Sequence, residues 1–319
     1  MLTTELLSLD KVNQLRTEHY NADVVDLIHV HEDLIKLRVH PDWGNASFLP
    51  GQYTVLGLGN WERRVEGVDE EDLDVVRLRR LLRRAYSFSC PILDENGRLL
   101  PPMFGEFLEF YIVLVRHREE QPPGLTPRIW GLSAGDRLFM GRKVTGHYTL
   151  AQVRPNDNVV FAATGTGEAP HNAMVAELLS IAHRGRVVAI TCARQQRDLG
   201  YLNTYDELER RYMNFKYLTL TTREPENLDM RLAHYVGKRY MQDFFESGEF
   251  ERASDLKLDP ENTHVFLCGN PNMIGAPLRD KIGSDRYPKP KGMVEVLESR
   301  GFSADEPGKP GNIHFEKYW

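Results

Sequence analysis

The sequence predicts two domains of different class: an antiparallel β-barrel over residues 20–153, then an α/β domain over residues 154–319 with a parallel, Rossmann-like sheet. The chain has 319 residues, which is more than one hydrophobic core usually supports. Its first half consists of short apolar runs separated by turn residues, a pattern typical of antiparallel strands. Its second half alternates apolar runs with helical patterns, which favours a parallel sheet covered by helices.

In the first half, the expected strands are the runs DVVDLIHV, DLIKLRVH, GQYTVLGL, EFLEFYIVLV and DRLFMGR. Pro50–Gly51, Asn96–Gly97 and Gly135–Asp136 supply turn signals between them. Residues 1–19 are expected to form an N-terminal arm or a short helix. Within an insertion at residues 60–83, acids lead and arginines follow around apolar residues from Asp69 to Arg84. This order suits a helix dipole, so we expect an inserted helix there.

In the second half, the expected strands are NVVFAATGTG, RVVAITCAR, FKYLTLTTRE and THVFLCGN. Helical patterns follow three of them, at APHNAMVAELLSIAHRG, around NTYDELERRY and from about Pro271. The rhythm changes near Arg154–Asn158, where we place the domain boundary. Strands that alternate with helices favour a parallel sheet with helices on its faces.

Composition excludes several classes of protein. A net charge of −6 argues against nucleic acid as the main partner, and no apolar run approaches the roughly 20 residues that span a bilayer. The first residues carry acids and lack the basic start of a secretory signal, so we expect a cytoplasmic protein. Cys90, Cys192 and Cys268 are far apart in the sequence, which argues against disulfides, a zinc site or an iron–sulfur cluster with four cysteine ligands.

A glycine-rich turn, Ala163-Thr-Gly-Thr-Gly-Glu-Ala-Pro170, follows one predicted strand and opens a helix. Glycines there let a phosphate approach backbone N–H groups at the positive end of the helix. The motif is not a GxGxxG fingerprint, and such a turn is as often a tight connection. It therefore needs companion motifs.

The companions occur in a fixed order along the chain: RAYS at 84–87, EFYIVLV, GLTPR, ATGTGEAP, CGNPNM and a terminal aromatic pair. In this order the motifs resemble the ferredoxin–NADP reductase family, particularly its bacterial branch, from about Asp23 to Trp319. The resemblance implies an FAD-binding barrel, an NADP(H)-binding α/β domain, and electron transfer between NADP(H) and a one-electron carrier such as ferredoxin or flavodoxin. FAD suits this task because it can take up two electrons as hydride and release them singly.

The resemblance also assigns residues to FAD. Arg84 would bind the pyrophosphate, Tyr86 would pack on the isoalloxazine, and Ser87 would hydrogen-bond near its reactive nitrogen. A guanidinium, a ring face and a hydroxyl suit these roles. Thr126 is expected to cap a helix that begins at Pro127. The other FAD contacts that the resemblance implies are Ala85, Tyr111, Ile112, Val113 and Leu125.

On the nucleotide side, the resemblance places Thr166 and Gly167 where the two cofactors face each other. Cys268 and Gly269 would lie where the nicotinamide approaches the flavin, so Cys268 joins Tyr86 and Ser87 in the expected catalytic centre. We expect Cys268 to shape the hydride path rather than to act as a nucleophile. The acidic Glu168 would either lend charge near the site or cap the helix.

Arginines at strand ends favour a nucleotide that carries a 2′-phosphate. Arg194 follows one strand, Arg223 follows the next, and Arg239 is the third candidate, with Lys238 as its alternative. The resemblance further implies that the terminal Tyr318 and Trp319 fold over FAD. Packing on the protein's own surface is the alternative for these two aromatic residues.

The densest basic cluster, Arg77, Arg79, Arg80, Arg83 and Arg84, leads into the flavin motif. It suits an acidic redox carrier, although the preceding EGVDEEDLD could neutralise it. Two other functions stay open: an NADPH-dependent flavin or quinone reductase or the reductase component of an oxygenase, and a regulatory flavin- or nucleotide-binding protein without turnover. The oligomeric state is not predicted.

Overall fold

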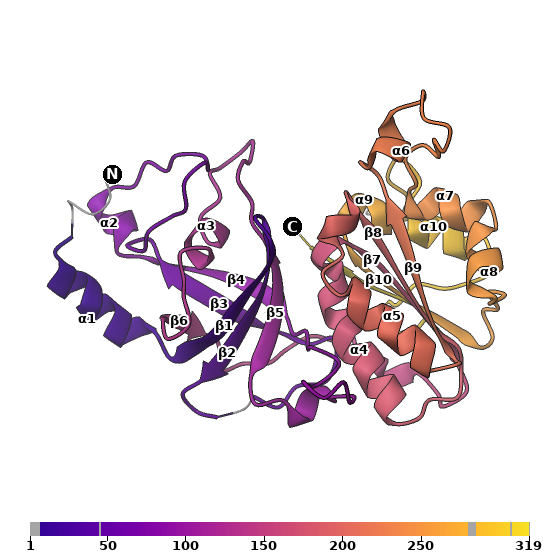
Figure 1. Ribbon diagram of the computed structural model, residues 1–319, viewed down its shortest axis with the longest axis horizontal. Helices are drawn as coiled ribbons and strands as arrows, with labels where there is room; N and C mark the ends of the chain where they lie inside the picture. Colours follow the sequence, from indigo (N-terminus) through magenta and orange to yellow (C-terminus); the bar gives the residue numbers. More distant parts are fainter. Residues whose placement is uncertain (1–6, 45, 280–284, 307, 319) are drawn as a thin grey trace. The chain divides into compact units, whose positions relative to one another are not determined.

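The computed structural model describes residues 7–44, 46–279, 285–306 and 308–318 (Figure 1). The chain divides into two compact units. The first, here called the barrel unit, comprises residues 1–91 and 100–147, and the second, the α/β unit, comprises residues 92–99 and 148–319. The division falls between His147 and Tyr148, six residues before the expected boundary, and the segment 92–99 groups with the α/β unit.

The barrel unit contains a six-stranded antiparallel sheet in the order β4-β3-β6-β1-β2-β5. The strands are β1 (Ala22–His31), β2 (Leu34–Pro41), β3 (Tyr53–Gly59), β4 (Leu81–Ser87), β5 (Leu108–Val113) and β6 (Arg137–Met140). The short helices are α2 (Val75–Leu78), η1 (Pro102–Phe104) and α3 (Thr126–Ile129). Beyond the end of β4, Ser89 donates its N–H to the carbonyl of Glu109 in β5 at 2.8 Å. This bridge joins the two edge strands, as the predicted barrel requires.

The N-terminal segment forms helix α1 (Leu9–His19), capped by the Ser8 side chain. Arg16 makes a bidentate ion pair with Glu62, at 2.9 and 2.6 Å, and the Tyr20 hydroxyl donates to the same carboxylate at 2.8 Å. Trp61 stacks on Tyr20. The arm is therefore fastened to the start of the 60–83 insertion.

The expected helix over Asp69–Arg84 is wrong. Only the four residues of α2 are helical, with Asp74 as the N-cap, and β4 begins at Leu81. From Leu81 to Ser87 the chain pairs with β3, in a register that places Arg84 opposite Leu56. The ladder hydrogen bonds of this pairing replace those of a helix, so tertiary context overrides the local charge pattern.

The α/β unit contains a five-stranded parallel sheet in the order β13-β10-β7-β8-β9. Its strands are β7 (Asn158–Thr164), β8 (Val187–Ala193), β9 (Phe215–Thr221), β10 (Thr263–Gly269) and β13 (Ile313–Lys317). The longer helices are α4 (Glu168–Ser180) and α5 (Leu202–Arg211). The shorter elements are η2 (Leu150–Gln152), η3 (Gly165–Gly167), η4 (Gln196–Asp198), α6 (Pro225–Leu228), α7 (Met241–Glu246), α8 (Glu249–Ser254), α9 (Pro271–Ile274), β11 (Leu278–Arg279), β12 (Asp285–Arg286) and α10 (Met293–Glu298).

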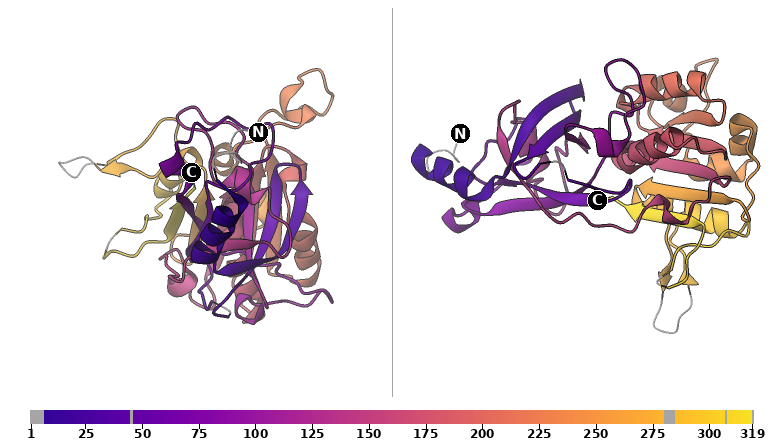
Figure 2. Two further views of the ribbon diagram at one scale, coloured as in Figure 1. Left: turned by 90° about the vertical axis from the view of Figure 1, so that its left-hand side faces the viewer. Right: turned by 90° about the horizontal axis from the view of Figure 1, so that it is seen from below.

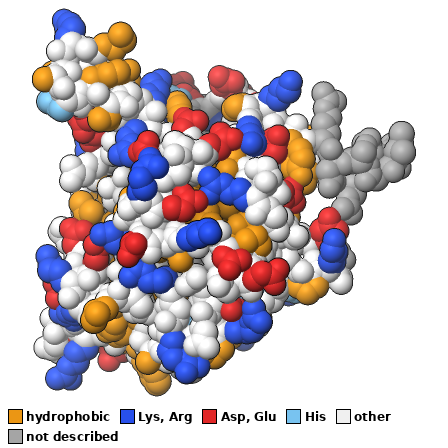
Figure 3. Space-filling model, turned by 90° about the vertical axis from the view of Figure 1, so that its right-hand side faces the viewer, with side chains coloured by type: hydrophobic (Ala, Val, Ile, Leu, Met, Phe, Trp, Pro, Cys, Tyr) orange, Lys and Arg blue, Asp and Glu red, His pale blue; other side chains and the backbone are white. Residues whose placement is uncertain are grey.

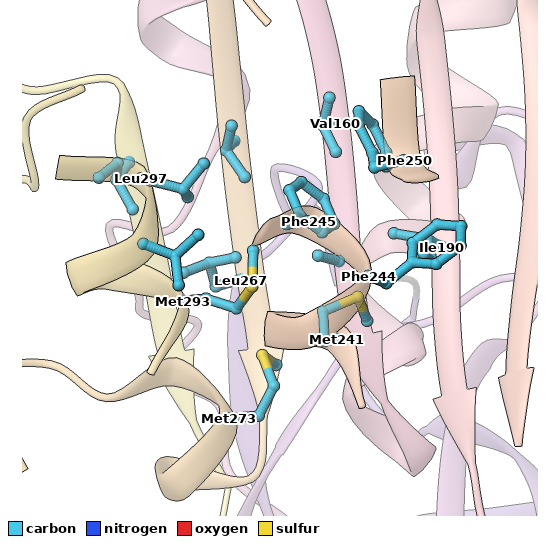
Figure 4. Packing of buried hydrophobic residues seen from close by; sticks show 14 of the residues in the cluster. Val160, Ile190, Met241, Phe244, Phe245, Phe250, Leu267, Met273, Met293 and Leu297 are labelled. Atoms are coloured by element: carbon cyan, nitrogen blue, oxygen red, sulfur yellow. The ribbon is translucent and has the colours of Figure 1, made fainter. Parts of the chain in front are cut away.

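Helices cover both faces of this sheet (Figures 1 and 2). On one face, Phe161 packs its ring against His171 of α4. On the other, Val160 and Ile190 join a core with residues of α7, α8 and α10 (Figure 4). Alternate residues of each strand point to opposite faces, which explains why β8 is buried along its whole length.

The strand order reverses between β7 and β10. Along the chain, β7, β8 and β9 extend the sheet in one direction, whereas β10 and β13 extend it in the other. The loops after β7 and β10 therefore leave the sheet on opposite sides. In open α/β sheets, ligands bind at such a switch point, beside the carboxyl ends of the strands.

Candidate functional site

In the barrel unit, the RAYS motif lies on β4. Arg84 and Tyr86 are two residues apart, so their side chains leave the same face of the strand. The Arg84 side chain is exposed, and it donates from Nη1 to the carbonyl of Arg83 at 2.8 Å, which leaves its other N–H groups for an anion. Burial raises the pKa of the Tyr86 hydroxyl above its ordinary value, so this group stays protonated near neutral pH.

The closing bridge of the barrel brings the second motif beside the first. Ser87 lies two residues before Ser89, and Tyr111 lies two residues after Glu109, on the two strands that this bridge joins. Ser87, Tyr111 and Ile112 are buried, whereas Val113 is exposed. The structure thus places the RAYS and EFYIVLV motifs on neighbouring strands.

Helix α3 is attached to the end of the same strand. The Thr126 hydroxyl accepts a hydrogen bond from the Val115 N–H at 3.1 Å. The expected role of Thr126 as N-cap is wrong, because Leu125 occupies the cap position and Thr126 is the first helical residue. Its hydroxyl instead holds the start of α3 against the chain that follows β5.

An ion pair that sequence analysis missed fixes α3 to the insertion. The guanidinium of Arg128 is fully buried and binds Glu71 at 2.7 Å, and it also donates to the carbonyls of Asn60 and Gly124. Glu71 further faces Arg64 at 3.6 Å. The GLTPR motif contained this arginine, but no spacing in the sequence indicated that its partner lies 57 residues earlier.

In the α/β unit, the switch point brings the two glycine motifs together. A Cβ on Gly167 would lie 2.3 Å from the carbonyl oxygen of Cys268, so only glycine allows this approach. Gly269 has a φ of +121°, and a Cβ there would lie 2.3 Å from the Thr164 hydroxyl. That hydroxyl accepts from the Asn270 N–H at 2.7 Å. Thr166 follows in the turn and is half-buried.

Cys268 is completely buried at the end of β10. Burial, with the nearby Glu316 as a lesser cause, raises the pKa of its thiol well above the ordinary value. A neutral thiol is a poor nucleophile, which agrees with the expectation that Cys268 does not act as one.

The chain end lies beside this motif within the α/β unit. The Tyr318 N–H donates to the carbonyl of Gly269 at 2.8 Å, which continues the pairing of β13 with β10. The pairing holds Tyr318 at the carboxyl edge of the sheet. Trp319 lies outside the described residues.

The expected phosphate-binding arginines lie at the carboxyl ends of β8 and β9. The Arg223 N–H donates to the carbonyl of Arg194 at 2.7 Å, so the two backbones are adjacent, and both side chains are exposed. Among the described residues, neither guanidinium has a partner. The Arg239 N–H contacts the Thr221 carbonyl at 3.3 Å, but its guanidinium pairs with Glu249 at 2.9 Å.

Glu168 does not face this edge. It is buried at the start of α4, where Thr191 and Tyr217 each donate a hydroxyl hydrogen bond to its Oε1 at 2.8 Å. It makes no side-chain cap, since Gly167 occupies the N-cap position. Burial raises the pKa of Tyr217 well above its ordinary value, with Glu168 as the next cause. The expected helix cap is therefore wrong, and the Glu168 carboxylate lies in the interior of the α/β unit.

The described residues were searched for metal-binding clusters and for membrane-spanning helices. They include no group of three or more histidine, cysteine, aspartate or glutamate side chains placed to hold a metal ion. Over the same ranges, no helix combines the length and the apolar character needed to cross a bilayer.

The chain is similar in sequence to one domain family and to several reductases. Residues 161–277 match the oxidoreductase NAD-binding domain family. The flavodoxin/ferredoxin–NADP reductase of Escherichia coli K12 is 30% identical over 245 residues, covering 76% of this chain and 81% of that protein. The enzyme of the same name from Buchnera aphidicola subsp. Schizaphis graminum is 25% identical over 302 residues, covering 94% of this chain and 98% of its own.

The fold has a solved counterpart. A ferredoxin NADP+ reductase from Neisseria gonorrhoeae with bound FAD and NADP superposes with a TM-score of 0.65 at 19% identity, covering 93% of this chain and 98% of that one. This likeness and the family match confirm the predicted order of an antiparallel domain and a parallel α/β domain. Since a 30% identical relative is covered over four fifths of its length, the chain belongs to the flavodoxin/ferredoxin–NADP reductase family, as its motifs predicted.

Proposed function

We propose that this chain holds FAD on the barrel unit and NADP(H) at the carboxyl edge of the parallel sheet, and passes electrons between NADP(H) and ferredoxin or flavodoxin. Family membership supports this class of oxidoreductase. The observation that carries the proposal is the close approach of Gly167 to Cys268 at the switch point. On the same edge, Arg194 and Arg223 have no side-chain partner within the part of the chain that the structure describes. Bound FAD supplies the exchange between hydride and single electrons.

The barrel residues fit a flavin dinucleotide. Against the described residues, Arg84 makes one side-chain hydrogen bond, to the Arg83 carbonyl, and its other N–H groups suit a pyrophosphate. Tyr86, on the same face of β4, offers a ring and a protonated hydroxyl. Ser87 and Tyr111 flank the bridge between β4 and β5, and α3 is fixed behind β5 by the Thr126 hydroxyl. These contacts would position the flavin; none of them requires a charged catalytic group.

The nucleotide edge fits a 2′-phosphorylated nucleotide. Arg194 and Arg223 present guanidinium groups at the ends of neighbouring strands, and the neighbourhood of β7 and β10 lacks side-chain bulk at Gly167 and Gly269. Arg239 is a weaker candidate, since its guanidinium is engaged with Glu249. Cys268 would exclude water beside the nicotinamide as a neutral, buried thiol.

The barrel unit has an exposed basic surface next to RAYS, where a redox carrier would dock. Two of the acids that precede the basic cluster are engaged elsewhere, since Glu71 binds Arg128 and Asp69 binds His117. Asp74 pairs with Arg77 of the cluster at 3.7 Å. Arg79 and Arg80 are exposed and, over the described residues, have no side-chain partner. Positive charge therefore remains next to RAYS, where it would attract the acidic surface of ferredoxin or flavodoxin.

The proposal is tested by extracting and identifying the flavin. The purified protein should retain FAD, and Arg84→Ala should lower the retained fraction. The matched control is Arg118→Ala, which removes another exposed arginine of the barrel unit. Absence of flavin after reconstitution with excess FAD would defeat the proposal. Bound FAD that NADPH does not reduce would favour the regulatory alternative.

A further inference from the structure

The first turn of α4 presents polar side chains to the interior of the α/β unit. Glu168, His171 and Asn172 are 1%, 1% and 0% exposed, and we call these three residues the polar stripe. Their spacing, i, i+3 and i+4, puts them on one face of the helix, where a helix that packs on a sheet usually carries apolar residues. On the face of the molecule that Figure 3 shows, acidic and basic side chains are interspersed at the surface, where water solvates them. The polar stripe is buried, so it needs hydrogen-bond partners instead.

Glu168 joins the start of α4 to two neighbouring strands. The hydroxyls of Thr191 in β8 and Tyr217 in β9 both donate to its Oε1 at 2.8 Å. The ring of Tyr217 stacks on Tyr205 of α5, with 4.4 Å between the ring centroids, which fixes the position of its hydroxyl oxygen. A hydrogen bond weakens when donor and acceptor move apart by a few tenths of an ångström, so the carboxylate is held more precisely than an apolar side chain would be.

The other two members of the polar stripe fasten the same turn to two further parts of the unit. Nε2 of His171 lies 2.7 Å from the hydroxyl of Tyr148, which precedes η2. The Tyr205 hydroxyl donates to Oδ1 of Asn172 at 2.6 Å, which links the turn to α5. An apolar stripe would bury the helix equally well but would let it slide, whereas these contacts select one position along the helix axis.

The polar stripe begins one residue after the close contact of the switch point. Gly167, the N-cap of α4, stands so near Cys268 that a Cβ would lie 2.3 Å from the cysteine carbonyl oxygen. Because Gly167 and Glu168 are consecutive, a shift of α4 along its axis would carry Gly167 with it and would open or compress this contact. The hydrogen bonds of Glu168 therefore determine where the glycine-rich turn stands relative to Cys268.

We propose that Glu168 is a positioning residue for hydride transfer, because its hydrogen bonds to β8 and β9 fix the glycine-rich turn where the nicotinamide would meet the flavin. The proposal rests on the proposed function and deepens it. In hydride transfer, NADPH gives up one hydrogen nucleus with two electrons and becomes NADP+, and the bound flavin takes them up. The rate of such a step falls by as much as about 100-fold when the reacting groups are displaced by about 1 Å. Since the Glu168 carboxylate is buried inside the unit, it acts through the turn and not by contact with either cofactor.

The first test changes Glu168 in two ways. Glu168→Gln keeps an oxygen that can accept from Thr191 and Tyr217, whereas Glu168→Leu, of similar size, removes it. FAD-loaded enzyme is mixed rapidly with NADPH under anaerobic conditions, and the loss of flavin absorbance is recorded. We expect the limiting rate at saturating NADPH to fall about 10- to 100-fold in Glu168→Leu and at most about threefold in Glu168→Gln. Equal losses in the two variants would overturn the proposal.

Thr191→Val tests the same contact from the strand, since it removes one hydroxyl with little change of shape. We expect a limiting rate about three- to tenfold lower than that of the wild type, with FAD content unchanged. The matched control is Thr263→Val. Thr263 is also buried, but it lies in β10 at the amino edge of the sheet, where its hydroxyl donates to Asn262 at 3.1 Å. Thr263→Val should keep the wild-type rate. If Thr191→Val kept it too, the hydrogen bond to Glu168 would have no positioning role, and this result decides even where Glu168→Leu does not retain FAD.

Two further measurements separate positioning from nucleotide affinity. The dissociation constant of 2′,5′-ADP, which carries no nicotinamide, should stay within about twofold of the wild-type value in Glu168→Leu. A higher dissociation constant with an unchanged limiting rate would overturn the proposal, because Glu168 would then determine affinity. Amide hydrogen exchange over residues 165–168 should be faster in Glu168→Leu than in the wild type and unchanged in Thr263→Val. Unchanged exchange over the turn in Glu168→Leu would also overturn the proposal.

Failure of the positioning role can be told apart from failure of the proposed function. If NADPH reduces the flavin of the wild type and of Glu168→Leu at the same limiting rate, the proposed function stands and the positioning role is wrong. If NADPH does not reduce the flavin of the wild-type enzyme, the proposed function is wrong, and the positioning role is wrong with it.

Discussion

Gly167 lies so close to Cys268 that a Cβ on the glycine would stand 2.3 Å from the cysteine carbonyl oxygen. This contact joins the turn after β7 to the end of β10 at the switch point. We predict that Gly167→Ala displaces one of the two segments, lowers the unfolding free energy by about 1–3 kcal/mol, and lowers kcat/KM for NADPH at least tenfold.

Denaturant unfolding and steady-state kinetics with an artificial acceptor measure these effects. The matched control is Gly131→Ala, where an added Cβ would make an ordinary contact at 3.4 Å. If Gly167→Ala and Gly131→Ala had the same unfolding free energy and the same kcat/KM for NADPH, the close approach of Gly167 to Cys268 would have no role in stability or turnover.

The proposed contacts of Arg194 and Arg223 with the 2′-phosphate predict that the enzyme prefers NADPH to NADH. Replacing Arg194 or Arg223 with alanine should raise the KM for NADPH about 10- to 100-fold, as expected for losing a charge-assisted hydrogen bond, and should leave the KM for NADH nearly unchanged. The control is Arg184→Ala, an exposed arginine at the opposite edge of the sheet. An unaltered ratio of kcat/KM for NADPH over NADH in both variants would remove these residues from the site.

The buried ion pair of Arg128 and Glu71 predicts a large stability difference. Arg128→Met leaves two carbonyl groups without their donor and the Glu71 carboxylate with only the longer contact to Arg64, so it should lower the unfolding free energy by about 3 kcal/mol. Arg116→Met breaks a pair with Asp33 that is one third exposed, and should cost at most about 1 kcal/mol. Urea unfolding compares the two, and equal losses would contradict the structural role of Arg128.

The burial of His171 predicts that the folded protein loses stability as the pH falls below 6.5. Burial lowers its pKa from 6.5 to about 3, and its Nε2 lies within hydrogen-bonding distance of the Tyr148 hydroxyl, at 2.7 Å. Between these pH values the unfolded chain binds a proton that the folded chain does not, so this contribution to stability is complete above pH 6.5 and declines toward pH 3.

The corresponding slope is at most about 1.4 kcal/mol per pH unit. In His171→Gln, the unfolding free energy should fall less steeply as the pH is lowered from neutral. Identical pH profiles for wild type and variant would show that His171 takes up its proton in the folded state.

The basic cluster predicts a salt effect on carrier turnover. Replacing Arg79, Arg80 and Arg83 with glutamine should slow ferredoxin or flavodoxin reduction and flatten its dependence on ionic strength, because the Debye length falls from about 30 Å at 0.01 M to about 10 Å at 0.1 M. FAD content and flavin reduction by NADPH should stay intact. Unchanged salt dependence with full FAD would mean that the cluster is only a solvated surface.

Sequence patterns predicted the strands and the α/β rhythm because burial imposes clear periods there. β7 to β10 were each foreseen within a few residues, and the order of the motifs identified the family. The same reasoning wrongly predicted a helix over Asp69–Arg84. The charge pattern there is typical of a helix, but residues of β4 pair with β3 instead. Local propensity could not reveal this, since the partner strand lies more than twenty residues earlier.

The positions of the candidate site residues were predictable where residue type limits the backbone or the strand pattern is clear, as for the glycines at 167 and 269 and the arginines at strand ends. Contacts across long sequence distances were not. Glu168 looked like a site residue because it follows the glycine turn, yet its carboxylate bonds to Thr191 and Tyr217 inside the unit.

The central claim is that one chain couples NADP(H) to a one-electron carrier through FAD. The most direct measurement is an anaerobic titration of the purified, FAD-loaded protein with NADPH, followed by addition of oxidised ferredoxin or flavodoxin while the flavin absorbance is recorded. The account predicts that NADPH bleaches the flavin, and that the carrier restores its absorbance while becoming reduced. A flavin that NADPH leaves oxidised, or that stays reduced when either carrier is added, would contradict it.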